Sequence, residues 1–345
     1  MTYSYGGKQI FPVVEQYHDL VPYLGGISEK EFFLDAEKAA KAWKSTNEIV
    51  ADYFKGKLKP KTPGAAPLSY GHLVCLGGSL RIPEDAEPNI RPFADDLDEG
   101  IAVLRERKDM DFSDTDIFRH YKMVNEYLQS EFPEEKISIT SGLGVEGVIT
   151  SAELMRGQDF LCDILDDPEK THEFLGLMNE SVIRFTQFRN ICNGQPAVNP
   201  SGGSLADDFA SIIPPALWPE YVVPYWNTYF EGVTSGERRF VHCENTYPEQ
   251  LKFLKDAKIT MYQPSVADRL TLDNIRENTD IPFDWLLYAY RITEMSDEEI
   301  QAWVDSAVEA GVTKIRTQFG KYAWSSGKMD RILAFYKAFE KYADA

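Results

Sequence analysis

A short polar segment past the middle of the chain carries residue types suited to proton transfer or metal binding. The run RRFVHCE, residues 238–244, is typical of a buried strand and ends in His242, Cys243 and Glu244. Alternate residues of a strand share a face, so we expect His242 and Glu244 to point one way and Cys243 the other. An imidazole beside a carboxylate can bind a metal ion or move a proton. The simpler alternative is that His242 is a hydrogen-bonded strand residue and Glu244 caps the next helix.

Two adjacent carboxylates, Asp207 and Asp208, follow the segment SGGSLA at another predicted strand end. Neighbouring like charges raise the pKa of one member of such a pair, so one can act as a general acid while the other orients it. The alternative is that Asp208 caps a helix that begins at Phe209.

Aromatic side chains recur near the predicted strand ends, and three of them, Tyr262, Tyr290 and Phe319, are candidates to bind a flat ring substrate. Aromatic residues at such positions also pack beneath loops, which is the competing interpretation.

These candidates are separated by segments that alternate between strand-like and helix-like patterns. Alternation of this kind predicts parallel strands joined by helical crossovers, which fits a (β/α)8 TIM barrel or an open doubly wound sheet. The predicted helices cover residues 29–56, 168–194 and 218–233, and the predicted strands cover 72–78 (HLVCLGG), 137–142 (ISITSG), 238–244, 258–264, 283–290 and 313–319.

The length of 345 residues suits one such barrel, and no internal repeat or long linker interrupts the chain. We therefore predict a single domain over residues 1–345, in which residues 1–68 form an N-terminal helical extension.

The formal net charge of −19 disfavours binding to nucleic acid or to an anionic membrane surface. No apolar run is long enough for a membrane span, and the start of the chain has no signal-peptide pattern. The four cysteines form no CxxC pair, which favours reduced thiols and a cytoplasmic location.

The stretch from Ser138 to Tyr342 resembles the uroporphyrinogen decarboxylase superfamily. Its landmarks are SGLGVEGVITSAELMRGQDFLCDILDDPEKTHEFL, then SLADDFASIIPPALWPEYVVPYWNTYF, then VHCENTYPEQLKFL. The resemblance implies a (β/α)8 barrel. It favours the branch that transfers methyl groups through zinc and a corrinoid protein, because the arginine-rich N-terminal segment of the decarboxylases has no counterpart here.

Members of that branch that act on thiols carry His-x-Cys and a later cysteine. Here Cys243 follows His242 directly and no cysteine follows it, which disfavours thiol methylation. A Glu/His site suits oxygen-bound methyl donors instead, because hard ligands leave zinc a stronger Lewis acid.

A second candidate metal site consists of Glu84, Glu99 and His120, with fourteen and twenty intervening residues. This spacing resembles the zinc motif of the methyltransferase I component of anaerobic O-demethylases that act on veratrol or vanillate. The alternative is that His120 is an ordinary residue of an amphipathic helix and that both glutamates serve as helix caps.

The resemblance therefore implies a methyltransferase that moves the methyl group of a methoxylated aromatic compound to Co(I) of a corrinoid protein, with the ether oxygen activated by zinc or by an acid. The cobalamin would belong to the partner, because this chain has no DxHxxG signature. Two alternatives stay open: a decarboxylase for a smaller substrate, and an inactive barrel that only binds an aromatic ligand or a corrinoid protein.

Overall fold

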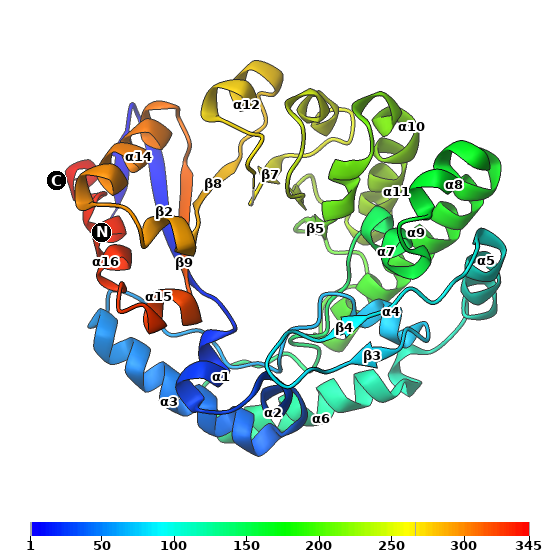
Figure 1. Cartoon of the computed structure of the whole chain (residues 1–345), viewed down its shortest axis with the longest axis horizontal. Helices are drawn as coiled ribbons and strands as arrows, with labels where there is room; N and C mark the ends of the chain where they lie inside the picture. The colour runs from blue at the N-terminus through cyan, green and yellow to red at the C-terminus, as the bar shows by residue number, and fades with distance from the viewer. Residues whose placement is uncertain (1, 266, 345) are drawn as a thin grey trace.

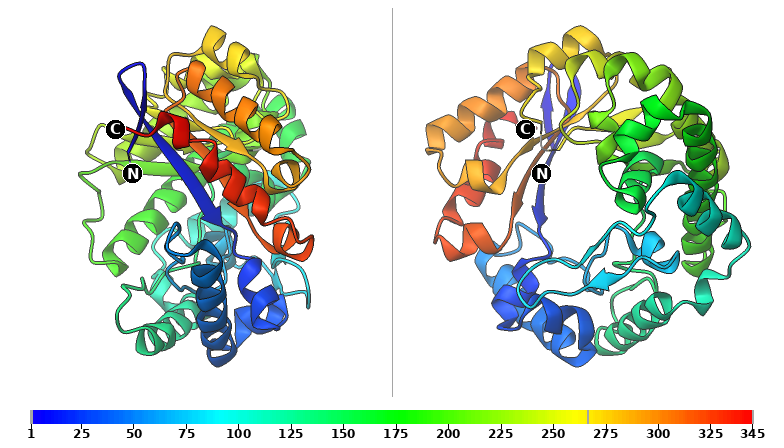
Figure 2. Two further views of the ribbon diagram at one scale, coloured as in Figure 1. Left: turned by 90° about the vertical axis from the view of Figure 1, so that its left-hand side faces the viewer. Right: turned by 45° about the vertical axis from the view of Figure 1, so that its right-hand side comes forward.

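The computed structural model describes residues 2–265 and 267–344, and its chain runs once around a ring (Figure 1). Helices lie on the outside in chain order, and the turned views in Figure 2 show the same arrangement. The two termini meet where the ring closes, since Tyr3 forms an antiparallel bridge with Ala343.

Strands form two main sheets, with the orders β1-β2-β9-β8 and β5-β6-β7. A parallel bridge between Tyr262 and Phe283 joins β7 to the start of β8, so the two sheets form one arc. Apart from the antiparallel β1–β2 pair, neighbouring strands of this arc are parallel. The strands are β1 (Tyr3–Tyr5), β2 (Lys8–Gln16), β3 (Leu80–Arg81), β4 (Asn89–Ile90), β5 (Gly203–Ala206), β6 (Arg239–His242), β7 (Met261–Gln263), β8 (Asp284–Leu287) and β9 (Lys314–Phe319).

The N-terminal segment is not the purely helical extension that the sequence predicted. Gly6 and Gly7, both at positive φ, make the tight turn of a β-hairpin, and β2 then runs parallel to β9 with Phe11 opposite Lys314. The segment was misjudged because its pairing partner lies about 300 residues later in the sequence.

The arc does not close into a hydrogen-bonded cylinder in the described residues. Between β2 and β5 the chain forms the separate antiparallel pair β3–β4. Its other contacts there are isolated: Leu68 bridges Leu143 in parallel, and the Gly147 amide donates to the Ala206 carbonyl at 2.5 Å. The observed architecture is mixed α/β, and the closed barrel is not formed by the strand pairing.

The predicted helix over 29–56 is two helices, because Asp35 ends the first and its carboxylate caps the second through the Lys38 amide at 3.0 Å. No helix in the described part of the chain has the length and apolar character to cross a membrane. The helices are α1 (Leu20–Gly25), α2 (Glu29–Leu34), α3 (Ala36–Phe54), α4 (Gly71–Cys75), α5 (Leu97–Glu106), α6 (Asp116–Glu131), α7 (Val148–Arg156), α8 (Phe160–Asp166), α9 (Pro168–Cys192), α10 (Trp218–Tyr221), α11 (Val223–Val233), α12 (Leu272–Asn278), α13 (Ala289–Ile292), α14 (Asp297–Glu309), α15 (Lys321–Ser325) and α16 (Asp330–Lys337).

Two predicted strands are wrong. The apolar run HLVCLGG forms the short helix α4, because a short apolar run suits a buried helix as well as a buried strand. The run ISITSG forms turns. There the Thr140 amide donates to the Ser138 hydroxyl at 3.1 Å and so does not bond to a neighbouring strand.

The strands of the arc bury one set of side chains against the helices and turn the other set inward. Val241, Tyr262 and Ile315 are fully buried in the main core beside the helices. The alternate residues on the same strands, among them His242 and Gln263, carry the polar groups described next.

Candidate functional site

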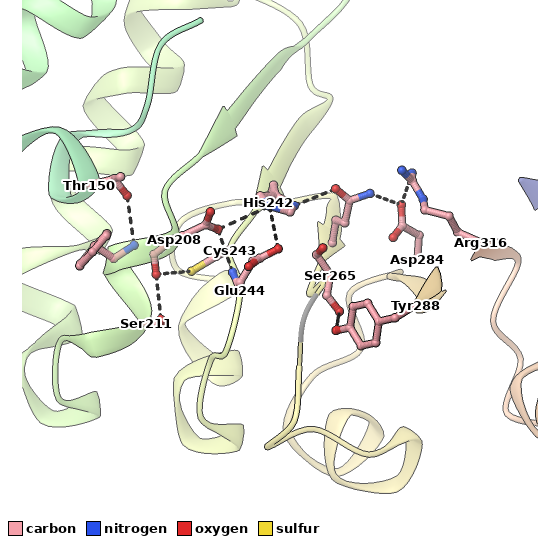
Figure 3. A network of polar contacts seen from close by, with 12 residues as sticks. Thr150, Asp208, Ser211, His242, Cys243, Glu244, Ser265, Asp284, Tyr288 and Arg316 are labelled. Carbon is pink, nitrogen blue, oxygen red and sulfur yellow. Dashed lines mark hydrogen bonds and ion pairs between the residues drawn. The ribbon is translucent and has the colours of Figure 1, made fainter. Parts of the chain in front are cut away.

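A chain of polar contacts crosses neighbouring strands on the inner face of the arc (Figure 3). It begins at His242 on β6, whose Nδ1 lies 2.8 Å from Oε1 of Gln263 on β7. The Gln263 amide nitrogen then donates to Oδ2 of Asp284 on β8 at 2.8 Å. That oxygen also accepts from Arg316 of β9 at 2.8 Å, and Arg316 reaches Glu15 of β2.

This series of polar contacts determines which ring nitrogen of His242 carries a proton. Arg316 and Lys314, at 2.8 Å and 3.3 Å, hold the fully buried Asp284 carboxylate as an acceptor. Gln263 must therefore turn its NH2 group toward Asp284 and its carbonyl oxygen toward His242. Nδ1 of His242 is then the donor, which leaves Nε2 directed into the site.

Nε2 of His242 faces two carboxylates. It lies 3.5 Å from Oδ1 of Asp208 and 3.7 Å from Oε1 of Glu244. Oδ1 of Asp208 also accepts from the Glu244 amide at 2.9 Å, so Asp208 fixes the backbone that carries Glu244. The arrangement is suited to holding a proton between an imidazole and two carboxylates.

Cys243 points away from this group, as the alternation of strand side chains predicts. Its thiol is fully buried with Sγ 3.9 Å from the Asp208 carbonyl, and burial raises its pKa well above the ordinary value. A thiol in this state is a poor nucleophile and a poor metal ligand.

Asp207 and Asp208 have different surroundings, although they are adjacent in the sequence. Asp207 is fully buried and accepts from the Thr150 amide at 2.8 Å, the Thr150 hydroxyl at 2.9 Å and Nε1 of Trp226 at 2.8 Å. These bonds fasten the N-terminus of α7, and Gly147 leaves room for them, since a Cβ there would lie 2.4 Å from Cγ of Asp207. Burial raises the pKa of Asp207 to about 6. The structure therefore places Asp207 beneath the site, and Asp208 within it.

A further carboxylate, Glu146, belongs to this group and was missed in the sequence. Its Oε2 atom is buried without a hydrogen-bond partner in the described residues. Burial, followed by the charges of Asp208 and Asp207, raises its pKa to about 8, so Glu146 holds a proton at neutral pH. Its position in GVEG, after a glycine-rich segment, was the available signal.

The proposed triad Glu84, Glu99 and His120 is not gathered by the fold. Oε2 of Glu84 lies 3.6 Å from Nζ of Lys30 on α2. At the start of α5, the Glu99 carboxylate accepts a hydrogen bond from the Asp95 amide at 2.7 Å. His120 on α6 has Nε2 2.9 Å from the Phe33 carbonyl. Glu99 and His120 thus have the capping and packing roles of the alternative interpretation, whereas Glu84 forms a surface ion pair.

The described residues contain no group of three or more His, Cys, Asp or Glu side chains arranged to hold a metal ion. The imidazole–carboxylate group around His242 does not meet this arrangement either, so the residues as placed do not fit zinc. Zinc stays a prediction from the resemblance, and no chemical step below depends on it.

Two of the predicted ring-binding aromatics face the helices. Tyr262 is fully buried, with its hydroxyl 2.5 Å from that of Thr246, and Phe319 is fully buried against Phe54 at a centroid distance of 5.2 Å. Both predictions are wrong, because these residues occupy the outward positions of β7 and β9. Tyr290 is 55% exposed and stacks on Tyr288, so it remains available to a ligand.

No protein-family model and no curated protein sequence matches the chain. Among solved structures, a methyltransferase from Methanosarcina mazei is similar, with a TM-score of 0.67 and 12% sequence identity over 96% of this chain and 94% of that one. At this identity the similarity concerns the fold. This chain thus has the fold of that methyltransferase along almost its whole length.

Proposed function

We propose that this protein is a methyltransferase that takes the methyl group of a methoxylated aromatic compound and passes it to the reduced corrinoid of a partner protein. The observation that carries the proposal is the group formed by His242, Asp208 and Glu244 at the carboxyl ends of β5 and β6, together with the protonated Glu146 just before α7. The shared fold with a methyltransferase supports it.

The group suits this reaction because the aryl oxygen of a methyl ether is a poor leaving group until it is protonated. When the bond between oxygen and methyl carbon breaks, the methyl group passes to Co(I), which becomes methyl-Co(III). The oxygen keeps the bonding electron pair and takes a proton from Glu146, giving a phenol. Asp208 and Glu244 face Nε2 of His242, so a proton can pass among these three groups.

We further propose that the strand arc is part of a (β/α)8 barrel. The Leu68–Leu143 bridge and the Gly147–Ala206 contact lie between β2 and β5, where the missing strands of a barrel would run. In a barrel, the ends of β5, β6 and β7 open onto the face where TIM-barrel enzymes place their active sites.

The test is a methyl-transfer assay with cobalamin reduced to Co(I), free or on a corrinoid protein, and guaiacol, vanillate and veratrol as donors. We expect methyl-Co(III) to form with at least one donor, and His242→Ala to lower the rate by about 10² to 10⁴. His172→Ala, on the outer helix α9, is the matched control and should keep the rate.

Failure of every donor, with the corrinoid shown to be active by methyl iodide, would refute the proposal. Release of carbon dioxide from a carboxylated aromatic without a corrinoid would instead support the decarboxylase. Elemental analysis of the same preparation for zinc tests the metal prediction separately.

A further inference from the structure

A hollow with a volume of about 470 Å³ lies at the carboxyl end of β2. The hollow adjoins the series of polar contacts that runs from His242 to Glu15, because Glu15 also lines the hollow. The residues that matter for its chemistry are Gln16, Tyr17, Lys61 and Gln318.

Gln16 lines this hollow and carries a buried amide without a hydrogen-bond partner in the described residues. The residue is only 7% exposed, and neither Nε2 nor Oε1 has a hydrogen-bond partner in the described residues. A buried polar group without a partner destabilises the folded state, so a protein seldom keeps two such atoms together unless a ligand satisfies them.

Lys61 adds a positive charge beside this amide. Its Nζ donates to the Gln16 carbonyl at 3.5 Å, and no carboxylate in the described part of the chain lies within 4.0 Å of it. Burial of the ammonium group lowers the pKa of Lys61. The carboxylate whose charge acts on Lys61, that of Glu15, is already paired with Arg316 at 2.5 Å. The charge of Lys61 is therefore available to an anion, in a protein whose net charge is −19.

Tyr17 connects this hollow with the candidate site. Burial, followed by the charges of Glu87, Asp19 and Glu244, raises its pKa to about 12. The phenol therefore stays neutral. Tyr17 directly follows β2 and Glu244 follows β6, so both lie at the carboxyl ends of their strands.

We infer that this hollow binds the carboxylate of the aromatic substrate, which makes methoxybenzoates rather than neutral methoxybenzenes the substrate class. The inference rests on the proposed function. Lys61 and the NH2 group of Gln16 donate to the two carboxylate oxygens, and Oε1 of Gln16 accepts from the remaining donors of the Lys61 ammonium. Both unsatisfied atoms of Gln16 gain partners in this arrangement.

The experiment measures binding by calorimetry, so it does not depend on methyl transfer. The probe is 4-methylbenzoate, which lacks the ether, and the neutral comparison is 4-methylbenzamide. We expect the acid to bind at least about tenfold more tightly than the amide, because charged hydrogen bonds are the stronger ones. Lys61→Met should remove this preference, whereas Lys57→Met, an exposed lysine outside the hollow, should preserve it.

Gln16→Met provides a second and independent measurement. It should weaken binding of 4-methylbenzoate and at the same time raise the melting temperature of the ligand-free protein, because it removes two unsatisfied buried atoms. A residue that is merely structural would lower the melting temperature when replaced.

Equal affinity for the acid and the amide, or unchanged binding in Lys61→Met, would overturn the inference. Acetate that binds as tightly as 4-methylbenzoate would also overturn it, since the site would then be one for small anions. Selective binding of the acid without any methyl transfer would uphold this inference and count against the proposed function, so the two failures are distinguishable.

Discussion

His242 differs from His72 and His120 in what its two ring nitrogens face. His72 is fully buried with Nε2 2.9 Å from the Ser181 hydroxyl, and burial lowers its pKa to about 3. His120 meets a backbone carbonyl. In His242 one nitrogen contacts the amide of Gln263 and the other faces two carboxylates, so this ring is both oriented and close to proton-accepting groups.

The hydrogen bonds that lead from Arg316 through Asp284 and Gln263 to His242 predict that Gln263 positions the imidazole ring of His242. Gln263→Leu removes the acceptor of Nδ1, and we expect methyl transfer to fall by about 10- to 100-fold, as when an orienting partner of a functional histidine is lost. The ¹⁵N spectrum of His242 should change from one tautomer to a mixture. Met261→Leu, on the same strand, is the control, and an unchanged spectrum in Gln263→Leu would contradict this role.

Glu146 gives the protein a dependence on pH that can be measured. Its folded-state pKa of about 8 lies above the ordinary 4.5, so the folded state binds more protons than the unfolded state between these values. The free energy of unfolding should therefore decrease as pH rises through this window, by up to about 1.4 kcal/mol per pH unit from this group. Urea unfolding between pH 5 and pH 9 measures it.

The matching variant is Glu146→Gln, which cannot lose a proton. We expect its unfolding free energy to vary less with pH than that of the wild type, and its methyl transfer to lack the component that declines above pH 8. Glu134→Gln, an exposed glutamate elsewhere, should retain the wild-type dependence. Identical pH profiles for Glu146→Gln and wild type would show that Glu146 is not the group that titrates.

The sequence identified part of this site because strand ends are recognisable locally. Asp208 follows one predicted strand, His242 and Glu244 lie at the end of another, and the structure brings the three together. Gln263 and Asp284 were not singled out, because their importance comes from the register between neighbouring strands, which one sequence does not reveal. For the same reason Tyr262 was assigned to the wrong face.

At the level of elements, α7 depends on the carboxylate beneath its first turn. Asp207 accepts from the Ile149 and Thr150 amides at that end and from Trp226 of α11. Asp207→Asn places an amide group against these donors, so we expect the free energy of unfolding to fall by about 2–4 kcal/mol. Asp208→Asn should change stability much less and methyl transfer much more.

Chemical denaturation and the methyl-transfer assay on both variants test this division. If Asp207→Asn were as stable as the wild type but inactive, Asp207 would belong to the reacting group after all. The opposite result for Asp208, a loss of stability with full activity, would remove Asp208 from the site.

Elements with strong local signals were predicted well. The long helix α9 begins with a capping aspartate followed by proline, and β6 and β9 are short runs with inward and outward alternation. Elements without such signals were not: α4 is too short for a helical period to emerge, and the serine and threonine hydroxyls at 138–140 decide the local backbone.

At the scale of the whole molecule, the N-terminal strand connects the last strand to the rest of the ring. β2 pairs with β9 along Phe11 to Gln16, and Ile10 and Val14 are buried in the main core. Without β2, β9 would be an exposed parallel edge, and the pairing between Arg316 and Glu15 would be lost. The first residues are therefore part of the domain and not an appendage.

This predicts different outcomes for two N-terminal deletions. Removal of residues 2–7 takes away only the edge strand β1 and its turn, and the protein should keep a cooperative thermal transition with a modestly lower midpoint. Removal of residues 2–18 takes away β2 as well, and we expect aggregation or loss of the cooperative transition, because an unpaired apolar edge promotes association. Circular dichroism melting and size-exclusion chromatography distinguish the two results. A monomeric, cooperatively folding protein that begins at Asp19 would show that the ring does not need β2, and that the helical extension predicted from the sequence is the better description of this segment.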